Sequence, residues 1–307
     1  MADTTPAPAV PLPHRTATRA PTLALLGVTA VWGSTFVVVK DAVDKMPVTD
    51  FLAWRFLLAA TAMLLLRPRA VAALGRAGCR VGVLLGLALA AGYLLQTLGL
   101  QHTSAAVSGF ITGMFVVLTP LGAAVLLRTP PGRSAWAAVV VATAGLALLS
   151  LHGLAVGPGE LLTLGCAAAF ALHIVGLGRW AASYDAFGLA VVQLLVVGVL
   201  CGVVAAPGGL VVPPDAGVWG ALALTALAAT ALAFLVQTWA QAHLPPTRAA
   251  VVMTMEPVFG GVFAIGLAGE HLGPREAVGA VLVLLAMVLT EVGPRHGAEG
   301  AVSRLET

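Results

Sequence analysis

Ten apolar runs, each about as long as the roughly 20 residues that a helix needs to cross a bilayer, divide the sequence. Charged residues, Pro and Gly separate the runs. They lie near residues 22–40, 50–66, 81–101, 104–127, 134–151, 159–178, 186–206, 217–241, 247–268 and 275–292. The sequence therefore predicts an all-α polytopic membrane protein with ten transmembrane helices, embedded in a lipid bilayer.

The composition agrees with this class and excludes others. Hydrophobic residues make up 59% of the chain and charged residues only 9%, which is far from the balance of a soluble domain. A net charge of +3 is no sign of nucleic-acid binding, and none is expected. The three cysteines, Cys79, Cys166 and Cys201, have no metal-ligand spacing, so we expect no metal, no cofactor and no disulfide.

The placement of basic residues predicts the orientation of the chain in the membrane. With ten spans both termini lie on one side, and that side holds Arg15, Arg19, Arg67, Arg69, Arg76, Arg80, Arg128, Arg133, Arg179, Arg248, Arg295 and Arg304. The opposite side holds Lys40, Lys45 and Arg275. Because basic loops stay in the cytoplasm, both termini are predicted to be cytoplasmic. The abundance of Arg over Lys, with Ala and Gly, suggests a bacterial chain, hence the plasma membrane.

The chain also repeats itself. When the first half of the sequence is aligned with the second at a shift of 141 residues, Gln96 aligns with Gln237. At a shift of 138 residues, Trp32 aligns with Phe170. Two halves with five helices each must have opposite orientations across the membrane. Inverted repeats of this kind are typical of secondary transporters, whose binding site lies between the repeats near the midplane.

Three segments resemble EamA-type members of the drug/metabolite transporter superfamily. They are AVWGSTFVVVKDAV…FLAWRFLLAA, LQHTSAAVSGFITGMFVVLTPLGAAVLL and TRAAVVMTMEPVFGGVFAIGLAGEHLGPREAVGAVLVLLAMVL. The resemblance implies ten helices in two inverted five-helix repeats, and export of amino acids or other small metabolites, often driven by protons. Family members often carry a carboxylate after the fourth helix, as Glu270 stands after the ninth, but this chain has Thr129 there.

The predicted organisation follows from these observations. Residues 1–21 form a disordered cytoplasmic tail, 22–151 and 158–292 form the two five-helix repeats, and 293–307 form a second cytoplasmic tail. A small-molecule substrate and a proton are the expected partners besides lipid, and a homodimer is left open.

Glu256 is the leading candidate for a functional residue. It lies in the middle of the run 247–268, where a carboxylate costs about 2.5–3.5 kcal/mol on insertion scales. It can bind a substrate amine or exchange a proton, or it can be a structural group that a neighbouring helix satisfies. Pro257 follows at once and interrupts helical hydrogen bonding. Pro257 and Pro120 are therefore candidate hinges for alternating access.

Two further candidates each have a structural alternative. Arg55 can bind a substrate carboxylate in a bidentate fork, or it can reach the outer interface or pair with Asp50 or a backbone carbonyl. Trp32 can line a cavity formed beside the small residues next to it, or it can pack in the bundle without a role in binding.

The remaining candidates are polar or aromatic residues inside apolar runs. His173 changes charge near neutral pH and suits proton coupling, although a lone His is more often structural. Gln96 and Gln237, near opposite ends of their helices, can line the pathway or form gates, and interhelical hydrogen bonds explain them equally well. Gln193, the repeat partner of Arg55, and Tyr93 complete the set.

A secondary transporter explains these features best, and a passive facilitator with the same fold is the main alternative. An intramembrane enzyme is disfavoured, because the residues before Ser108-Gly109 fail the pattern of a serine nucleophile and no catalytic residues are found. A scaffold without transport leaves the cost of inserting Glu256 and Arg55 unexplained.

Overall fold

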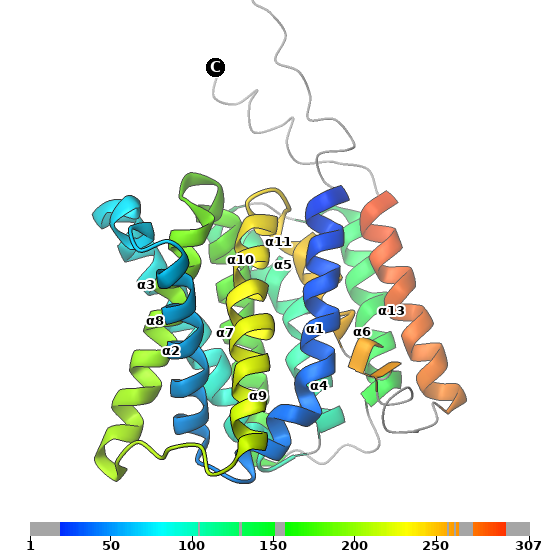
Figure 1. Cartoon of the computed structure of the whole chain (residues 1–307). Coiled ribbons are helices and arrows are strands. Elements are labelled where there is room, and N and C mark those ends of the chain that lie inside the picture. Colours follow the sequence, from blue (N-terminus) through cyan, green and yellow to red (C-terminus); the bar gives the residue numbers. More distant parts are fainter. Residues whose placement is uncertain are drawn as a thin grey trace, which may run out of the picture.

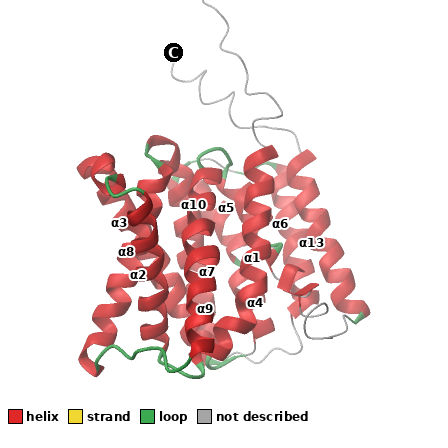
Figure 2. Ribbon diagram, in the orientation of Figure 1, coloured by secondary structure: helices red, strands yellow, loops and turns green. Residues whose placement is uncertain are grey.

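The computed structural model describes residues 19–103, 105–128, 131–150, 157–256, 258–260, 262–263 and 273–292. All of the regular structure in this part of the chain is helical, and no strand occurs there (Figure 2). Residues 1–18 and 293–307 of the two predicted tails lie outside the described residues. So do the candidate hinge Pro257 and the residues Thr129 and Glu270.

The helices form one bundle (Figure 1). They are α1 (Arg19–Val43), α2 (Val48–Leu66), α3 (Ala70–Leu100), α4 (Ala105–Gly113), α5 (Phe115–Leu126), α6 (Arg133–Ser150), α7 (Pro158–Trp180), α8 (Ala186–Ala205), α9 (Ala216–Ala226), α10 (Ala233–Gln241), α11 (Pro246–Met253) and α13 (Pro274–Val292). A π-helical turn, η4 (Leu227–Leu232), joins α9 to α10. Short 3-10 turns, η2 (Ala181–Ser183) and η3 (Ala206–Gly208), follow α7 and α8.

Five helical stretches among the described residues are long and apolar enough to cross a membrane. They are Val48–Leu66, Ala70–Leu100, Pro158–Ser183, Ala186–Gly208 and Ala216–Gln241. Shorter apolar helices occupy Ile111–Leu126, Arg133–Leu148 and Ala277–Ala286. The all-helical membrane class predicted from the sequence is thus supported, while the count of ten spans stays a prediction.

Two helices begin three or more residues before the predicted start. α1 begins at Arg19, so residues 19–21 are helical rather than part of a disordered tail. α3 begins at Ala70 instead of residue 81, because the basic segment before the apolar run is rich in the good helix formers Ala, Leu and Arg. Gly75, with a φ of 64°, interrupts the helix there, a conformation that glycine adopts without steric cost.

Helices of the two halves run in opposite directions in Figure 1. α1 leads from the upper end of the bundle to the lower end, whereas α7 leads from the lower end to the upper. α2 and α8 are likewise opposed. α1 begins and α13 ends at the same end of the bundle.

Small residues allow α3 and α8 to approach closely. A Cβ added at Gly82 would lie 2.7 Å from Val192 Cγ1, and one added at Gly86 would lie 2.7 Å from Val196 Cβ. This contact packs the middle of α8, which carries Gln193, against α3.

Candidate functional site

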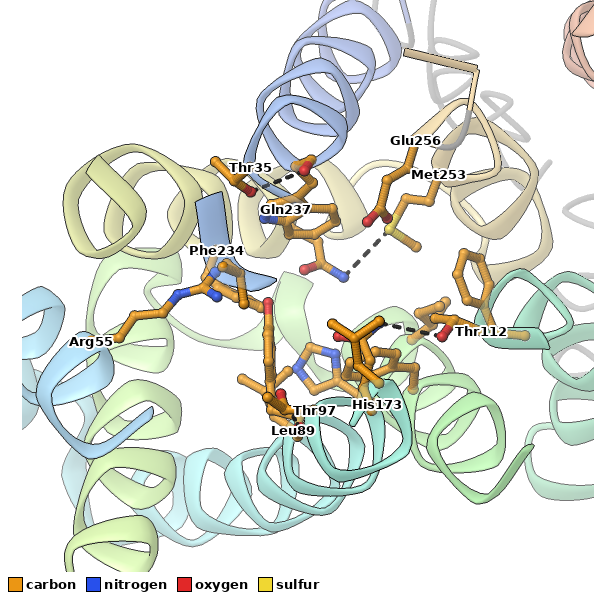
Figure 3. A pocket seen from close by; sticks show the side chains of 18 residues that line it. Thr35, Arg55, Leu89, Thr97, Thr112, His173, Phe234, Gln237, Met253 and Glu256 are labelled. Carbon is orange, nitrogen blue, oxygen red and sulfur yellow. Dashed lines mark hydrogen bonds between the residues drawn. The ribbon is translucent and has the colours of Figure 1, made fainter. Parts of the chain in front are cut away.

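A cavity of about 90 Å³ lies between helices of both halves of the chain (Figure 3). One water needs roughly 10–15 Å³ of such space, so the cavity has room for a small solute. Its walls combine aromatic rings with a few polar groups. Seven of the eight residues predicted from the sequence to bind substrate or couple transport line it: Trp32, Arg55, Tyr93, Gln96, His173, Gln237 and Glu256.

Gln193 is the exception, because it is fully buried behind the cavity wall on α8. Its Nε2 donates to the Leu189 carbonyl at 3.0 Å, which turns its Oε1 toward His173 Nε2 at 2.6 Å. Since Gln193 offers an acceptor there, His173 Nε2 is the donor. Gln193 therefore orients the imidazole of His173 and does not touch the cavity itself.

The π-helical turn η4 holds two cavity residues at once. The Trp32 indole donates to the Ala229 carbonyl at 2.8 Å. Arg55 Nε donates to Thr230 Oγ1 at 2.7 Å, and its Nη2 donates to the Ala229 carbonyl at 3.4 Å. A π-turn changes the angular spacing of the backbone and is often found at functional sites. Here it ties α1 and α2 to the same point of the second half.

Arg55 is a cavity residue and does not reach the outer interface, as one alternative held, because only 4% of it is exposed. Nor does it pair with Asp50, which accepts hydrogen bonds from Thr49 Oγ1 and the Val211 amide. The guanidinium carbon lies 5.3 Å from the centre of the Tyr93 ring, within the range of cation–π attraction.

Glu256 reaches the cavity from the segment that follows α11. α1 comes very close to this segment, since a Cβ added at Gly33 would lie 2.6 Å from the Glu256 carbonyl oxygen. Two ion pairs shorter than 4.0 Å occur in the described part of the chain, Lys45–Asp215 and Arg67–Asp185. Neither involves Glu256, so no described cation neutralises this carboxylate by direct contact.

Gln96 and Gln237 line the same cavity, so the structure brings these two repeat partners to one site, and a role as gates stays a prediction. The Gln96 amide donates to Thr112 Oγ1 at 3.3 Å. Gln237 donates to Gln241 Oε1 at 3.0 Å and more weakly to Met253 Sδ at 3.7 Å.

Pro120 lies buried inside α5, which continues through it. The break in this apolar run falls instead at Met114, between α4 and α5. A hinge at Pro120 stays a prediction. Among the described residues, no three His, Cys, Asp or Glu side chains gather where they could hold a metal ion.

Sequence reasoning missed several residues of the cavity, among them Phe170, Phe234, Thr35, Thr112 and Met253. The repeat contained the signal that could have found them. The shift of 141 pairs Tyr93 with Phe234, Gln96 with Gln237, Thr112 with Met253, and Phe115 with Glu256. The shift of 138 pairs Trp32 with Phe170 and Thr35 with His173. Each of these twelve residues lines the cavity, so corresponding positions of the two halves build it together.

Comparisons with known proteins agree with this architecture. The model of the EamA-like transporter family matches residues 20–151 and again residues 157–292. An uncharacterized transporter of Archaeoglobus fulgidus is 30% identical over 270 residues, which are 88% of this chain and 85% of that protein. A protein crystal structure has the same fold, with a TM-score of 0.74 at 17% identity over 88% of this chain and 96% of that one.

Proposed function

The chain belongs to the EamA-like transporter family, and on this premise we propose that it is a secondary active transporter that exports amino acids or related small metabolites. The observation that carries the proposal is the cavity between the two halves. It contains a carboxylate, Glu256, and a guanidinium, Arg55, among aromatic rings. One acid and one base at bilayer depth suit a small zwitterion, and their insertion cost indicates a functional use.

Alternating access is the proposed mechanism. In this proposal residues 22–151 and 158–292 are two inverted five-helix repeats with ten spans in total, and a site between such repeats can open to either side by rocking one half against the other. Pro120 and Pro257 are proposed as hinges. The pairing of cavity positions at constant sequence shifts and the opposed directions of α1 and α7 support this proposal.

The proposed location is a bacterial plasma membrane, with both termini in the cytoplasm. The end of the bundle where α1 begins and α13 ends also carries the α2–α3, α5–α6, α7–α8 and α10–α11 connections (Figure 1). Most of the basic residues in the described part of the chain lie at that end, which supports a cytoplasmic orientation.

Proton coupling is proposed to act through Glu256. This carboxylate lines the cavity and has no ion-pair partner among the described residues, so it is the group proposed to exchange the proton. His173 is a second candidate, although its hydrogen bond to Gln193 also gives it a structural role.

The test is uphill efflux from proteoliposomes under an imposed pH gradient, with a panel of amino acids, purines, sugars and cationic drugs. We expect concentrative movement of one compound by the wild type and its loss in Glu256→Gln, which keeps the shape of the side chain and removes the exchangeable proton. Asp44→Asn is the control, since Asp44 is an exposed carboxylate outside the cavity. Normal coupled flux in Glu256→Gln would make Glu256 structural.

A passive facilitator is the alternative function, because a channel can use the same cavity. It predicts flux that is only downhill and independent of the pH gradient. We propose no catalytic activity for this chain.

A further inference from the structure

Gln237 presents an acceptor that no described residue uses. The side chain is 3% exposed, and its Oε1 has no hydrogen-bond partner among the described residues although the residue lines the cavity. A buried carbonyl oxygen without a donor is destabilising, so an unpaired acceptor of this kind calls for an explanation.

A chain of amide contacts fixes which end of Gln237 faces the cavity. Gln241 Nε2 donates to the Ile174 carbonyl at 3.0 Å, so Gln241 Oε1 is turned toward Gln237. Gln237 Nε2 donates to that oxygen at 3.0 Å. If the Gln237 amide were flipped, two carbonyl oxygens would face each other. The Ile174 carbonyl on α7 therefore sets the orientation of the Gln237 amide on α10, with Gln241 as the intermediate residue.

Glu256 adds a second acceptor to the same cavity. In Figure 3 the amide nitrogen of Gln237 is the end turned toward Met253, and Glu256 lies beside Met253. The Gln237 amide nitrogen is already engaged with Gln241 and the Met253 sulfur, so only its oxygen is available to a ligand. Arg55, the cation of the cavity lining, instead directs two of its nitrogens into the π-turn. Among the described residues, the Gln237 oxygen thus has no hydrogen-bond donor and the Glu256 carboxylate has no ion-pair partner.

We infer that Gln237 is a specificity-determining residue whose side-chain oxygen accepts a hydrogen bond from an ammonium group with N–H donors on the transported compound, in the cavity that Glu256 also lines. The inference rests on the proposed function and names the part of the substrate that this wall selects. A primary ammonium has three N–H donors, so it can donate to the Gln237 oxygen in a cavity whose lining includes the Glu256 carboxylate. A quaternary ammonium has the same charge and leaves the Gln237 oxygen without a partner.

Two isomeric cations test the inference, n-butylammonium with three N–H donors and tetramethylammonium with none. They have the same formula and charge, so long-range attraction to Glu256 does not separate them. Binding to the purified wild type is measured by the rise of its unfolding temperature with ligand concentration. We expect n-butylammonium to bind about tenfold to hundredfold more tightly, as a hydrogen bond to a charged group implies.

Two variants and a control separate the acceptor from general packing. Gln237→Met keeps the length of the side chain, removes the oxygen, and is expected to abolish the preference between the isomers. Gln241→Met leaves Gln237 in place but releases its orientation, so the preference is expected to fall partway. Gln101→Met alters an exposed glutamine outside the cavity and is expected to keep the full preference.

The outcomes distinguish this inference from the proposed function. Equal or absent binding of the two cations to the wild type would overturn it, as would a full preference in Gln237→Met. If the preference follows the expected pattern while proteoliposomes show no uphill flux of any compound, the proposed transport fails and the acceptor site stands. Coupled flux with an unchanged preference in Gln237→Met would leave transport intact and remove Gln237 from recognition.

Discussion

Arg55 is held in the bundle by the hydroxyl of Thr230 and the carbonyl of Ala229. Both acceptors belong to η4, so the position of a cation on α2 depends on one hydroxyl group that lies 175 residues away in the sequence. A buried guanidinium that loses an acceptor cannot recover it from water. Thr230 is therefore a positioning residue for Arg55.

Thr230→Val removes this hydroxyl with little change in shape. We expect a loss of about 1–3 kcal/mol in the free energy of unfolding, because a buried charged donor is left unpaired. Thr225→Val is the matched control, since the Thr225 hydroxyl donates to the Ala221 and Leu222 carbonyls of its own helix. Thermal unfolding of the purified proteins measures both. Equal losses in the two variants would show that the contact with Arg55 adds nothing.

At the scale of elements, the approach of α1 to the segment after α11 depends on Gly33. A Cβ at this position would lie 2.6 Å from the Glu256 carbonyl oxygen and 2.7 Å from the Gly260 amide nitrogen. Both of these contacts are with backbone atoms, so no flexible side chain there can move aside to make room for a methyl group. The two segments carry Trp32 and Glu256 into the cavity, so their spacing sets its width.

Gly33→Ala is expected to push α1 away and to lower the free energy of unfolding by about 1–3 kcal/mol, the usual cost of overpacking. Coupled flux is expected to fall as well, because the cavity wall shifts. Gly27→Ala on the same helix meets no atom within 4 Å and is expected to change neither property. Thermal unfolding and proteoliposome flux test the pair. A stable, fully active Gly33→Ala protein would mean that α1 is free to move here.

At the scale of the whole molecule, the distribution of charge predicts which end faces the cytoplasm. Arg76 lies on α3 at the basic end, whereas Val212 lies in the exposed connection between α8 and α9 at the other end (Figure 1). Arg76→Cys and Val212→Cys, each in a protein whose Cys79, Cys166 and Cys201 are replaced, report the side of each position. In intact cells, a membrane-impermeant maleimide is expected to label position 212 and not position 76. The reverse pattern would invert the proposed topology.

The sequence by itself determined that the chain is a helical membrane protein, because long apolar runs and charge asymmetry are local properties that folding does not change. The resemblance of three segments to the EamA-type family, which the family match confirms, is likewise a property of the sequence alone. It also indicated Glu256, Arg55 and Trp32, since polar or bulky residues in apolar runs stand out without knowledge of their neighbours.

Only the tertiary structure decided which of these residues meet. Trp32 contacts Ala229, 197 residues away, and this contact depends on how two helices pack and on a π-turn that no periodicity predicts. The structure likewise separated Gln193, which orients His173, from Gln237, which faces the cavity. Both are glutamines in apolar runs. Their roles differ because the role of an amide side chain depends on its hydrogen-bond partners, and those partners come from distant parts of the chain.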